Sequence, residues 1–168
     1  DCTPAGNENK ERYYNKVKGP LGFLAQGSEF GFGTPYALGI NDEALRRDRD
    51  RFIQVVSCNT HNLSVLIKAL AGKPDGDIRL QDGHFVCMRR ANDISQEGSF
   101  IPSPKAGKHD DPLFGTHHAR DAWHIFKTLG KDLSLFSSAI KLNTQYMHAV
   151  WFNLVLKDAI TREQALTR

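Results

Sequence analysis

The chain lacks several features that mark whole classes of protein. No apolar run among its 168 residues approaches the roughly 20 residues that a membrane-spanning helix needs. Its N-terminus has no basic start and no apolar leader, so a signal peptide is not expected. Cysteine is scarce, and Cys2, Cys58 and Cys87 form no CxxC pair. We therefore expect neither a disulfide framework nor a zinc or other metal site, and we expect a reducing, cytoplasmic setting.

A strong charge of one sign is also missing. The chain has 22 Lys and Arg against 19 Asp and Glu, a formal net charge of +3. This balance is compatible with anionic metabolites, but no basic stripe interleaved with aromatic residues indicates a nucleic-acid partner. We expect neither nucleic acid nor membrane to be a partner. With 40% hydrophobic and 24% charged residues, the composition is that of one globular domain with a real core.

Apolar periodicity predicts strands and helices that do not alternate strictly. A β-branched run over 52–57 predicts a buried strand, and apolar residues at helical spacing predict a helix between Cys58 and Gly72. A turn is expected at Asp82-Gly83. This mixture predicts an α+β fold with a mixed, largely antiparallel sheet and helices packed on one face. Further strands are predicted at 21–25, 84–90 and 147–156, and further helices at 7–17, at 119–129 and from Thr161 onward.

Cys58 occupies the most informative position in the sequence. It lies where the predicted strand at 52–57 ends and a helix begins, with Asn59 or Thr60 as the expected N-cap. Unpaired backbone N–H groups and the positive end of the helix dipole favour a thiolate there, and the same amides can hold an oxyanion. The alternative is a small, buried structural cysteine. Cys87, in mid-strand, is expected to be inert core.

A cysteine nucleophile needs a base and a binding site for its substrate. His148, at the terminal strand, is either a satisfied core histidine or a general base. Arg89 and Arg90 end a predicted strand, and they are either solvated or anion-binding. His117 and His118 precede a predicted helix, where backbone N–H groups favour phosphate. The alternative for this histidine pair is a surface or capping role.

At this point the sequence resembles a known family, the archaeal-type (type II) phosphorylating glyceraldehyde-3-phosphate dehydrogenases. The segment around Cys58 resembles the active-site segment of that family. Further matches follow in family order and span essentially the whole chain. The segments that carry the resemblance are Asp1-Cys2-Thr3-Pro4-Ala5-Gly6, Phe23-Leu24-Ala25-Gln26-Gly27, Val56-Ser57-Cys58-Asn59-Thr60, Met88-Arg89-Arg90-Ala91-Asn92-Asp93, Ile101-Pro102-Ser103-Pro104, Thr116-His117-His118 and Asn143-Thr144-Gln145-Tyr146-Met147-His148.

The resemblance implies a catalytic group of three residues. Cys58 would attack the aldehyde of glyceraldehyde 3-phosphate and form a thiohemiacetal. A hydride would pass to NAD or NADP, and inorganic phosphate would then cleave the thioester. His148 would act as the general base, and Asp93 would be a candidate charge partner that orients it.

The resemblance also implies binding residues and partners. Substrate or phosphate contacts would come from Asn59, Thr60, Arg89 and the pair of histidines, His117 and His118. Arg90 would contact the cofactor. The partners would be a small phosphorylated aldehyde, inorganic phosphate and further copies of the chain in a homo-oligomer.

Three positions depart from the family pattern. His61-Asn62 stands where the family has Thr-Gly, and Ala119-Arg120-Asp121 stands where it has Gly-Pro-Asp, which adds a cation. Val150 replaces a second histidine that often follows the Met-His pair. These departures leave the cysteine chemistry plausible but put the exact substrate in doubt.

The sequence contains no GxGxxG turn typical of a dinucleotide-binding domain. By the resemblance, residues 1–168 form a single catalytic domain, cut at both ends, and the nucleotide-binding domain lies outside them. The isolated chain is therefore expected to be inactive. Three alternatives stay open: a related cysteine-dependent dehydrogenase of semialdehydes or acyl phosphates, a non-catalytic binding or assembly domain of the same fold, and a thiol hydrolase.

Overall fold

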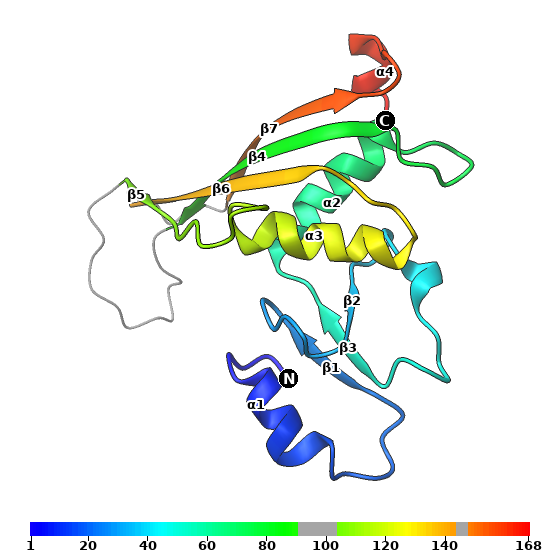
Figure 1. Cartoon of the computed structure of the whole chain (residues 1–168), viewed down its shortest axis with the longest axis vertical. Coiled ribbons are helices and arrows are strands. Elements are labelled where there is room, and N and C mark those ends of the chain that lie inside the picture. Colours follow the sequence, from blue (N-terminus) through cyan, green and yellow to red (C-terminus); the bar gives the residue numbers. More distant parts are fainter. Residues whose placement is uncertain (91–103, 144–147) are drawn as a thin grey trace.

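The computed structural model describes residues 1–90, 104–143 and 148–168, which form two β-sheets and the helices around them (Figure 1). The first sheet contains β1 (Phe23–Gln26), β2 (Thr34–Tyr36) and β3 (Phe52–Val55). The second contains β4 (Leu80–Arg90), β5 (Lys105–Ala106), β6 (Leu135–Leu142) and β7 (Ala149–Leu156). The helices are α1 (Gly6–Asn9), which a π-helical turn (Lys10–Tyr14) continues, a 3-10 turn (Asp42–Ala44), α2 (Cys58–Ala71), α3 (His117–Thr128) and α4 (Arg162–Leu166).

The first sheet is parallel, in the order β1-β3-β2. Its central strand is β3, which confirms a strand within the predicted range 52–57, but it ends at Val55 and only Gln54 of its residues is buried. Stacked rings join it to the first helical segment, with ring centroids 4.9 Å apart between Tyr14 and Phe23 and 5.3 Å apart between Phe23 and Phe52. A separate parallel sheet was not predicted, because strands of three or four residues carry too little pattern to reveal their partners.

The second sheet confirms the predicted α+β fold. Its order is β5-β6-β4-β7, with β4 and β6 parallel and the other two pairs antiparallel. The turn predicted at Asp82-Gly83 is wrong, because both residues lie inside β4. Gly83 is buried, and a Cβ there would lie 3.2 Å from a methyl of Leu135 and 3.3 Å from one of Leu80. The glycine allows close packing in mid-strand.

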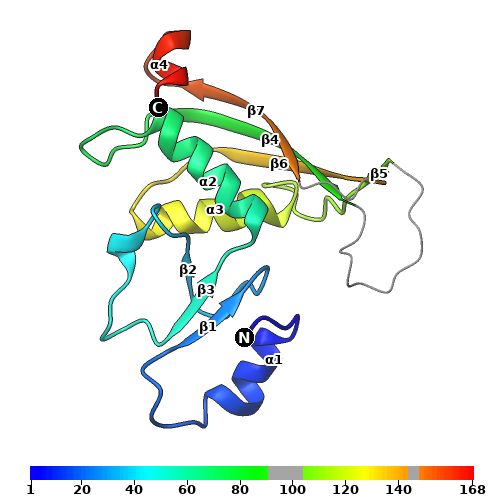
Figure 2. The same ribbon diagram turned by 180° about the vertical axis from the view of Figure 1, so that it is seen from behind.

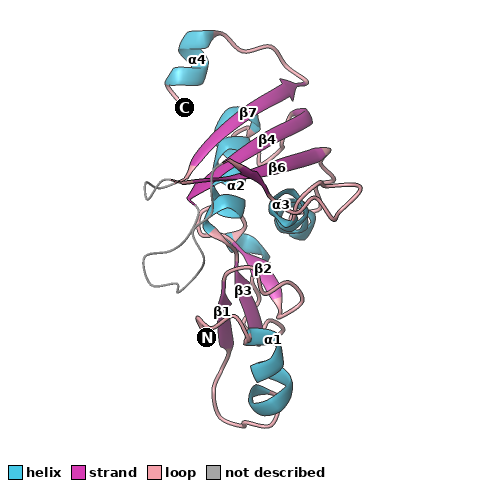
Figure 3. Ribbon diagram, turned by 90° about the vertical axis from the view of Figure 1, so that its left-hand side faces the viewer, coloured by secondary structure: helices cyan, strands magenta, loops and turns pink. Residues whose placement is uncertain are grey.

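Helices α2 and α3 cover one face of the second sheet, as predicted (Figure 3). Leu63 and Ile67 of α2 and Phe126 of α3 are fully buried against Phe85 and Cys87 of β4. The opposite face, here called the outer face, has no helix over it among the described residues. Its exposed apolar side chains are Phe136 (37% exposed), Trp151 (53%) and Val155 (43%).

Strand β3 leads directly into α2, so the start of α2 lies between the two sheets (Figures 1 and 2). The chain then ends in α4, whose N-cap is the predicted Thr161, in a capping box with Gln164. In the part of the chain that the structure describes, no helix is long and apolar enough to cross a bilayer.

Candidate functional site

Cys58 is the first residue of α2 and is exposed. The N-cap is Ser57, in extended backbone, and its hydroxyl accepts from the Thr60 amide at 3.5 Å and pairs with the Thr60 hydroxyl at 3.0 Å. The expected N-cap at Asn59 or Thr60 is therefore wrong by two or three residues, since the serine hydroxyl already satisfies the first turn. The cysteine at the helix start is thus presented to solvent beside free backbone amides.

The next two residues of α2, Asn59 and Thr60, differ in whether their side chains have hydrogen-bond partners. Asn59 is buried, and its Oδ1 has no hydrogen-bond partner among the described residues. A buried acceptor without a partner is costly, so this oxygen calls for a donor from outside the described residues. Thr60 is also buried, but its hydroxyl is held by Ser57. The structure gives Thr60 a capping role, and its predicted substrate contact stays a prediction.

Cys87 behaves as the sequence predicts. It is fully buried in the core, and burial raises the pKa of its thiol to about 11. The nearby Cys58 also raises this pKa, while Arg89 lowers it. Cys58, by contrast, is exposed to solvent and lies close enough to Cys87 of β4 to affect its pKa.

Register brings Arg89 and His148 together. In the antiparallel pairing of β4 with β7, Met88 lies opposite Ala149, so one further residue sets Arg89 opposite His148. Side chains alternate along a strand, which places Arg89 on the helix-covered face with Cys87. Arg89 Nε and His148 Nδ1 are buried without a partner among the described residues. Burial, together with the charges of Arg89 and Arg90, lowers the pKa of His148, so its imidazole is neutral near pH 7.

His117 and His118 open α3, with ring centroids 4.0 Å apart. They lie in its first turn, since the helix begins two residues before its predicted start at 119. Burial and then the Arg89 charge lower the pKa of His117 to about 4, and burial, His117 and Arg89 lower that of His118 to about 3. His118 is 1% exposed, and neither ring nitrogen has a partner among the described residues. Two neutral imidazoles therefore lie within the influence of the Arg89 charge, and that of His118 has no hydrogen-bond partner among the described residues.

The structure adds residues that sequence reasoning missed. Ser28 Oγ lies 3.2 Å from His117 Nε2, although the two are 89 positions apart. Arg120 donates to Asp121 Oδ1 from Nε and Nη2, both at 3.0 Å, and its guanidinium lies 4.2 Å from the ring centroid of Phe30. The one available signal was an acid on the buried face of the predicted helix, which implies a charged partner.

Apart from Cys58, Asn59 and Thr60 at the start of α2, the predicted site residues divide into three groups. Arg89, His117, His118 and His148 share one electrostatic neighbourhood at the helix-covered end of β4 and β7. By strand alternation Arg90 faces the other side of the sheet, although its charge also reaches His148. Asp93 lies outside the described residues. Across the described ranges, no group of three His, Cys, Asp or Glu side chains is placed to hold a metal ion.

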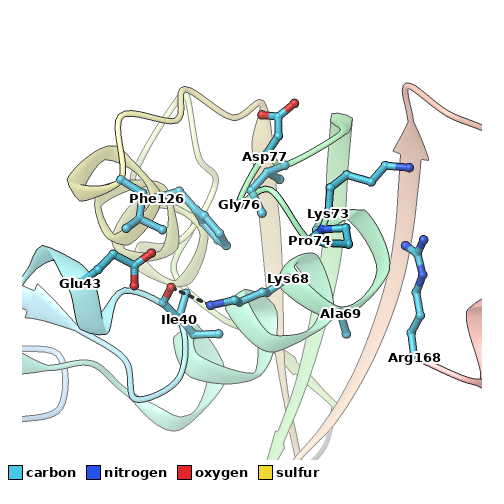
Figure 4. A pocket seen from close by; sticks show the side chains of 13 residues that line it. Ile40, Glu43, Lys68, Ala69, Lys73, Pro74, Gly76, Asp77, Phe126 and Arg168 are labelled. Atoms are coloured by element: carbon cyan, nitrogen blue, oxygen red, sulfur yellow. Dashed lines mark hydrogen bonds between the residues drawn. The ribbon is translucent and has the colours of Figure 1, made fainter.

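A separate cavity of about 360 Å³ lies at the other end of α2 (Figure 4). Ile40 and Phe126 line it, and Lys68 Nζ donates to the Ile40 carbonyl at its edge at 3.2 Å. Gly72, at the end of α2, also lines it, which at 1.5 Å per residue is roughly 20 Å along the helix from Cys58. The cavity is therefore distinct from the cluster around Arg89.

Comparison with known proteins gives one consistent family name. The chain is 30% identical over 174 residues to a glyceraldehyde-3-phosphate dehydrogenase of Methanococcoides burtonii, covering 97% of this chain and 45% of that protein. The enzyme of the same name from Archaeoglobus fulgidus is 29% identical, covering 99% of this chain and 46% of that protein, and the one from Pyrobaculum arsenaticum is 28% identical with the same shares. The chain spans less than half the length of these relatives. No protein-family model matches it.

Proposed function

Because the chain is homologous to the archaeal glyceraldehyde-3-phosphate dehydrogenases over nearly its whole length, we propose that it is the catalytic part of a phosphorylating aldehyde dehydrogenase. The observation that carries the proposal is the setting of Cys58: it is an exposed thiol at the start of α2, and both it and Arg89 act on the pKa of the buried Cys87 between them in β4. The substrate that fits this setting is a small aldehyde with a phosphate group.

The thiol carries the covalent steps of the proposed reaction. The Cys58 thiolate attacks the aldehyde carbon, a C–S bond forms, and the carbonyl oxygen takes the negative charge. Backbone amides at the start of α2 are oriented to stabilise that oxygen. After oxidation to the thioester, an oxygen of inorganic phosphate attacks the same carbon, the C–S bond breaks, and the thiolate and an acyl phosphate are released.

His148 is the proposed general base. A neutral imidazole accepts the proton of the thiol or of the thiohemiacetal hydroxyl, and a protonated one would not. The lowered pKa of His148 keeps it in the accepting form near pH 7. Asp93 is proposed as its charge partner from the family resemblance alone.

Arg89, with His117 and His118, forms the proposed anion site. Arg89 supplies the positive charge. Hydrogen bonds come from His118, whose ring nitrogens have no partner among the described residues, and from Nδ1 of His117, whose Nε2 is paired with Ser28. The amides at the start of α3 add further donors. Asn59, with its unpaired Oδ1, is proposed to meet a donor group of the substrate.

The nicotinamide cofactor, NAD or NADP, accepts the hydride in this proposal. The chain has no GxGxxG turn that would cradle a dinucleotide, so we propose that residues outside this chain hold most of the cofactor, and we derive no step through it. Arg90 is proposed to contact the cofactor. We propose that residues 1–168 alone do not turn over, which an assay of NAD- or NADP-dependent oxidation of glyceraldehyde 3-phosphate tests. Turnover by the isolated chain would contradict this.

The half-reactions at Cys58 need no cofactor and therefore test the proposal on the chain itself. An activated ester, p-nitrophenyl acetate, should acylate Cys58 with release of one p-nitrophenolate per chain. Added inorganic phosphate should then release acetyl phosphate, which hydroxylamine trapping detects. Cys58→Ser should abolish the burst, and His148→Gln should slow it by about 10²-fold or more.

The outcomes separate the rival functions. Release of acetate without acetyl phosphate would indicate a thiol hydrolase. No acylation of Cys58 at all would indicate a non-catalytic binding or assembly domain. Acetyl phosphate from the unaltered chain, followed by a different preferred aldehyde in a substrate panel, would indicate a related semialdehyde or acyl-phosphate dehydrogenase.

A homo-oligomer is proposed from the outer face of the second sheet. Phe136, Trp151 and Val155 are exposed together on a surface that no described element covers, and β7 is an uncharged edge strand. Such a surface favours burial against a second copy. Light scattering after size exclusion should give a multiple of the 18.8 kDa chain mass, and Trp151→Glu should give the monomer. The control is Leu21→Glu, at an exposed leucine outside this sheet. A monomeric unaltered chain would contradict the proposal.

A further inference from the structure

The segment between β1 and β2 (residues 27–33, here called the β1–β2 loop) contacts the first turns of α3, and Arg120 is the centre of that contact. We propose that Arg120 is a positioning residue: it clamps the β1–β2 loop onto α3 and so holds Ser28 against His117, fixing the His117 ring for contact with a phosphate group. The inference rests on the proposed function, because it assumes that His117 lies in the anion site.

The Arg120 guanidinium makes two contacts: it is hydrogen-bonded to a buried carboxylate on α3, and it stacks on an aromatic ring of the loop. Asp121 is 1% exposed, and its Oδ1 accepts both hydrogen bonds from the Arg120 guanidinium at 3.0 Å. Because that carboxylate is fixed in the buried face of α3, the guanidinium plane is fixed as well. Phe30 lies under this plane at 4.2 Å and also packs on the His124 ring, with centroids 4.8 Å apart. Two contacts on α3 therefore hold one exposed ring of the loop.

The β1–β2 loop is also held on the side away from α3, by Asn7 of α1, so the contact with Arg120 helps to fix the position of Ser28. Asn7 Nδ2 donates to the Phe30 carbonyl at 3.0 Å, and the Asn7 amide donates to Glu29 Oε2 at 3.0 Å. With Phe30 and Glu29 held from both sides, Ser28 has little freedom. Its hydroxyl then stays 3.2 Å from His117 Nε2.

The consequence for His117 is chemical. With Nε2 occupied by Ser28, Nδ1 is the ring nitrogen left for a ligand. If the Ser28 hydroxyl donates to Nε2, the neutral tautomer carries its proton on Nδ1 and donates it to an anion. The charges that face His117 are Arg89 from β4, Arg120 from its own helix and Asp110 from the preceding loop. The clamp therefore sets both the direction and the proton of this hydrogen bond.

The test compares variants on the full 168-residue chain, with inorganic phosphate as the probe. Arg120→Met removes the paired hydrogen bonds to Asp121 and the positive charge, and Ser28→Ala removes the hydroxyl. Each should weaken phosphate binding by about fivefold, the loss expected from one cation–π or hydrogen-bond contact. The double variant should be no weaker than either single one, because both act through His117. Arg49→Met is the matched control. Arg49 also donates two hydrogen bonds to the aspartate that follows it, Asp50, at 2.9 and 2.8 Å, but in another part of the chain.

A second readout does not depend on phosphate. NMR titration of the His117 ring should show a higher pKa in Arg120→Met, because one of the charges that lower it is gone and the released loop leaves the ring less buried. The rise should be smaller in Arg120→Lys, which keeps the charge but loses the paired hydrogen bonds, and absent in Arg49→Met. Burial and Arg89, the two larger causes of the low pKa, remain in every variant. Additive losses of phosphate affinity would show that Arg120 binds the anion directly and would overturn the positioning role, as would a His117 titration unchanged in Arg120→Met. If the unaltered chain binds no phosphate while the titration shifts as stated, the proposed function fails and the clamp stands.

Discussion

His118 gives a quantitative prediction about acid stability. Its ring is 1% exposed, neither nitrogen has a partner among the described residues, and its folded-state pKa is lowered to about 3. In the unfolded chain a histidine titrates near ~6.5. Between about pH 6.5 and pH 3, the His118 side chain is therefore protonated in the unfolded state and neutral in the folded state. The stabilisation is fully present above about pH 6.5 and is lost as the pH falls toward 3.

The magnitude follows from the width of that window. Each pH unit below the unfolded pKa costs about 1.4 kcal/mol per histidine, so the loss between pH 8 and pH 5 is about 2 kcal/mol for His118 alone. Replacing His118 by Gln removes this titration and keeps a polar side chain of similar length. The substitution adds a constant packing loss, which does not depend on pH.

Urea denaturation at pH 8, 7, 6 and 5, followed by tryptophan fluorescence, measures the effect. The difference in unfolding free energy between the unaltered chain and His118→Gln should shrink by about 2 kcal/mol from pH 8 to pH 5. The comparison cancels the carboxylates, which titrate alike in both chains. Parallel pH curves would refute the reasoning, because they would mean that His118 is solvated or protonated in the folded state.

Three further predictions concern the site around Cys58. Ser57→Ala removes the N-cap of α2 and should lower the unfolding free energy, measured by urea denaturation, by about 1 kcal/mol. An unchanged urea midpoint would show that the Ser57 side chain does not stabilise the helix. Arg89→Met removes a charge that disfavours protonation, so NMR titration should show a higher pKa for His148, and an unchanged value would place Arg89 elsewhere. Cys87 should resist iodoacetamide until the chain unfolds, and alkylation of the folded chain there would contradict its burial.

The sequence was informative where the signal is local. The strand at 52–55, within the predicted 52–57, the junction at Cys58 and the helices at 58–71 and 117–128 are all encoded in neighbouring residues. The capping residue was misassigned because Ser57, Asn59 and Thr60 are all good caps, and only backbone conformation separates them.

The rest of the site depends on residues that are distant in sequence. The contact between Ser28 and His117 spans 89 positions, and Phe30 reaches Arg120 of α3 from the β1–β2 loop. No periodicity encodes such a pair. Asp82-Gly83 misled for a related reason: the dipeptide favours a turn locally, but here β6 and β7 on both sides of β4 hold it in a strand, and packing overrides propensity.

The central claim is that the position of Cys58 at the start of α2, with His148 as its proposed base, makes its thiol reactive. The most direct measurement is the rate of alkylation of each cysteine by iodoacetamide at neutral pH, read by peptide mass spectrometry on the folded chain. Cys58 should react at least tenfold faster than Cys2, which is also exposed, and His148→Gln should reduce that advantage. Equal rates at Cys58 and Cys2 would contradict the claim.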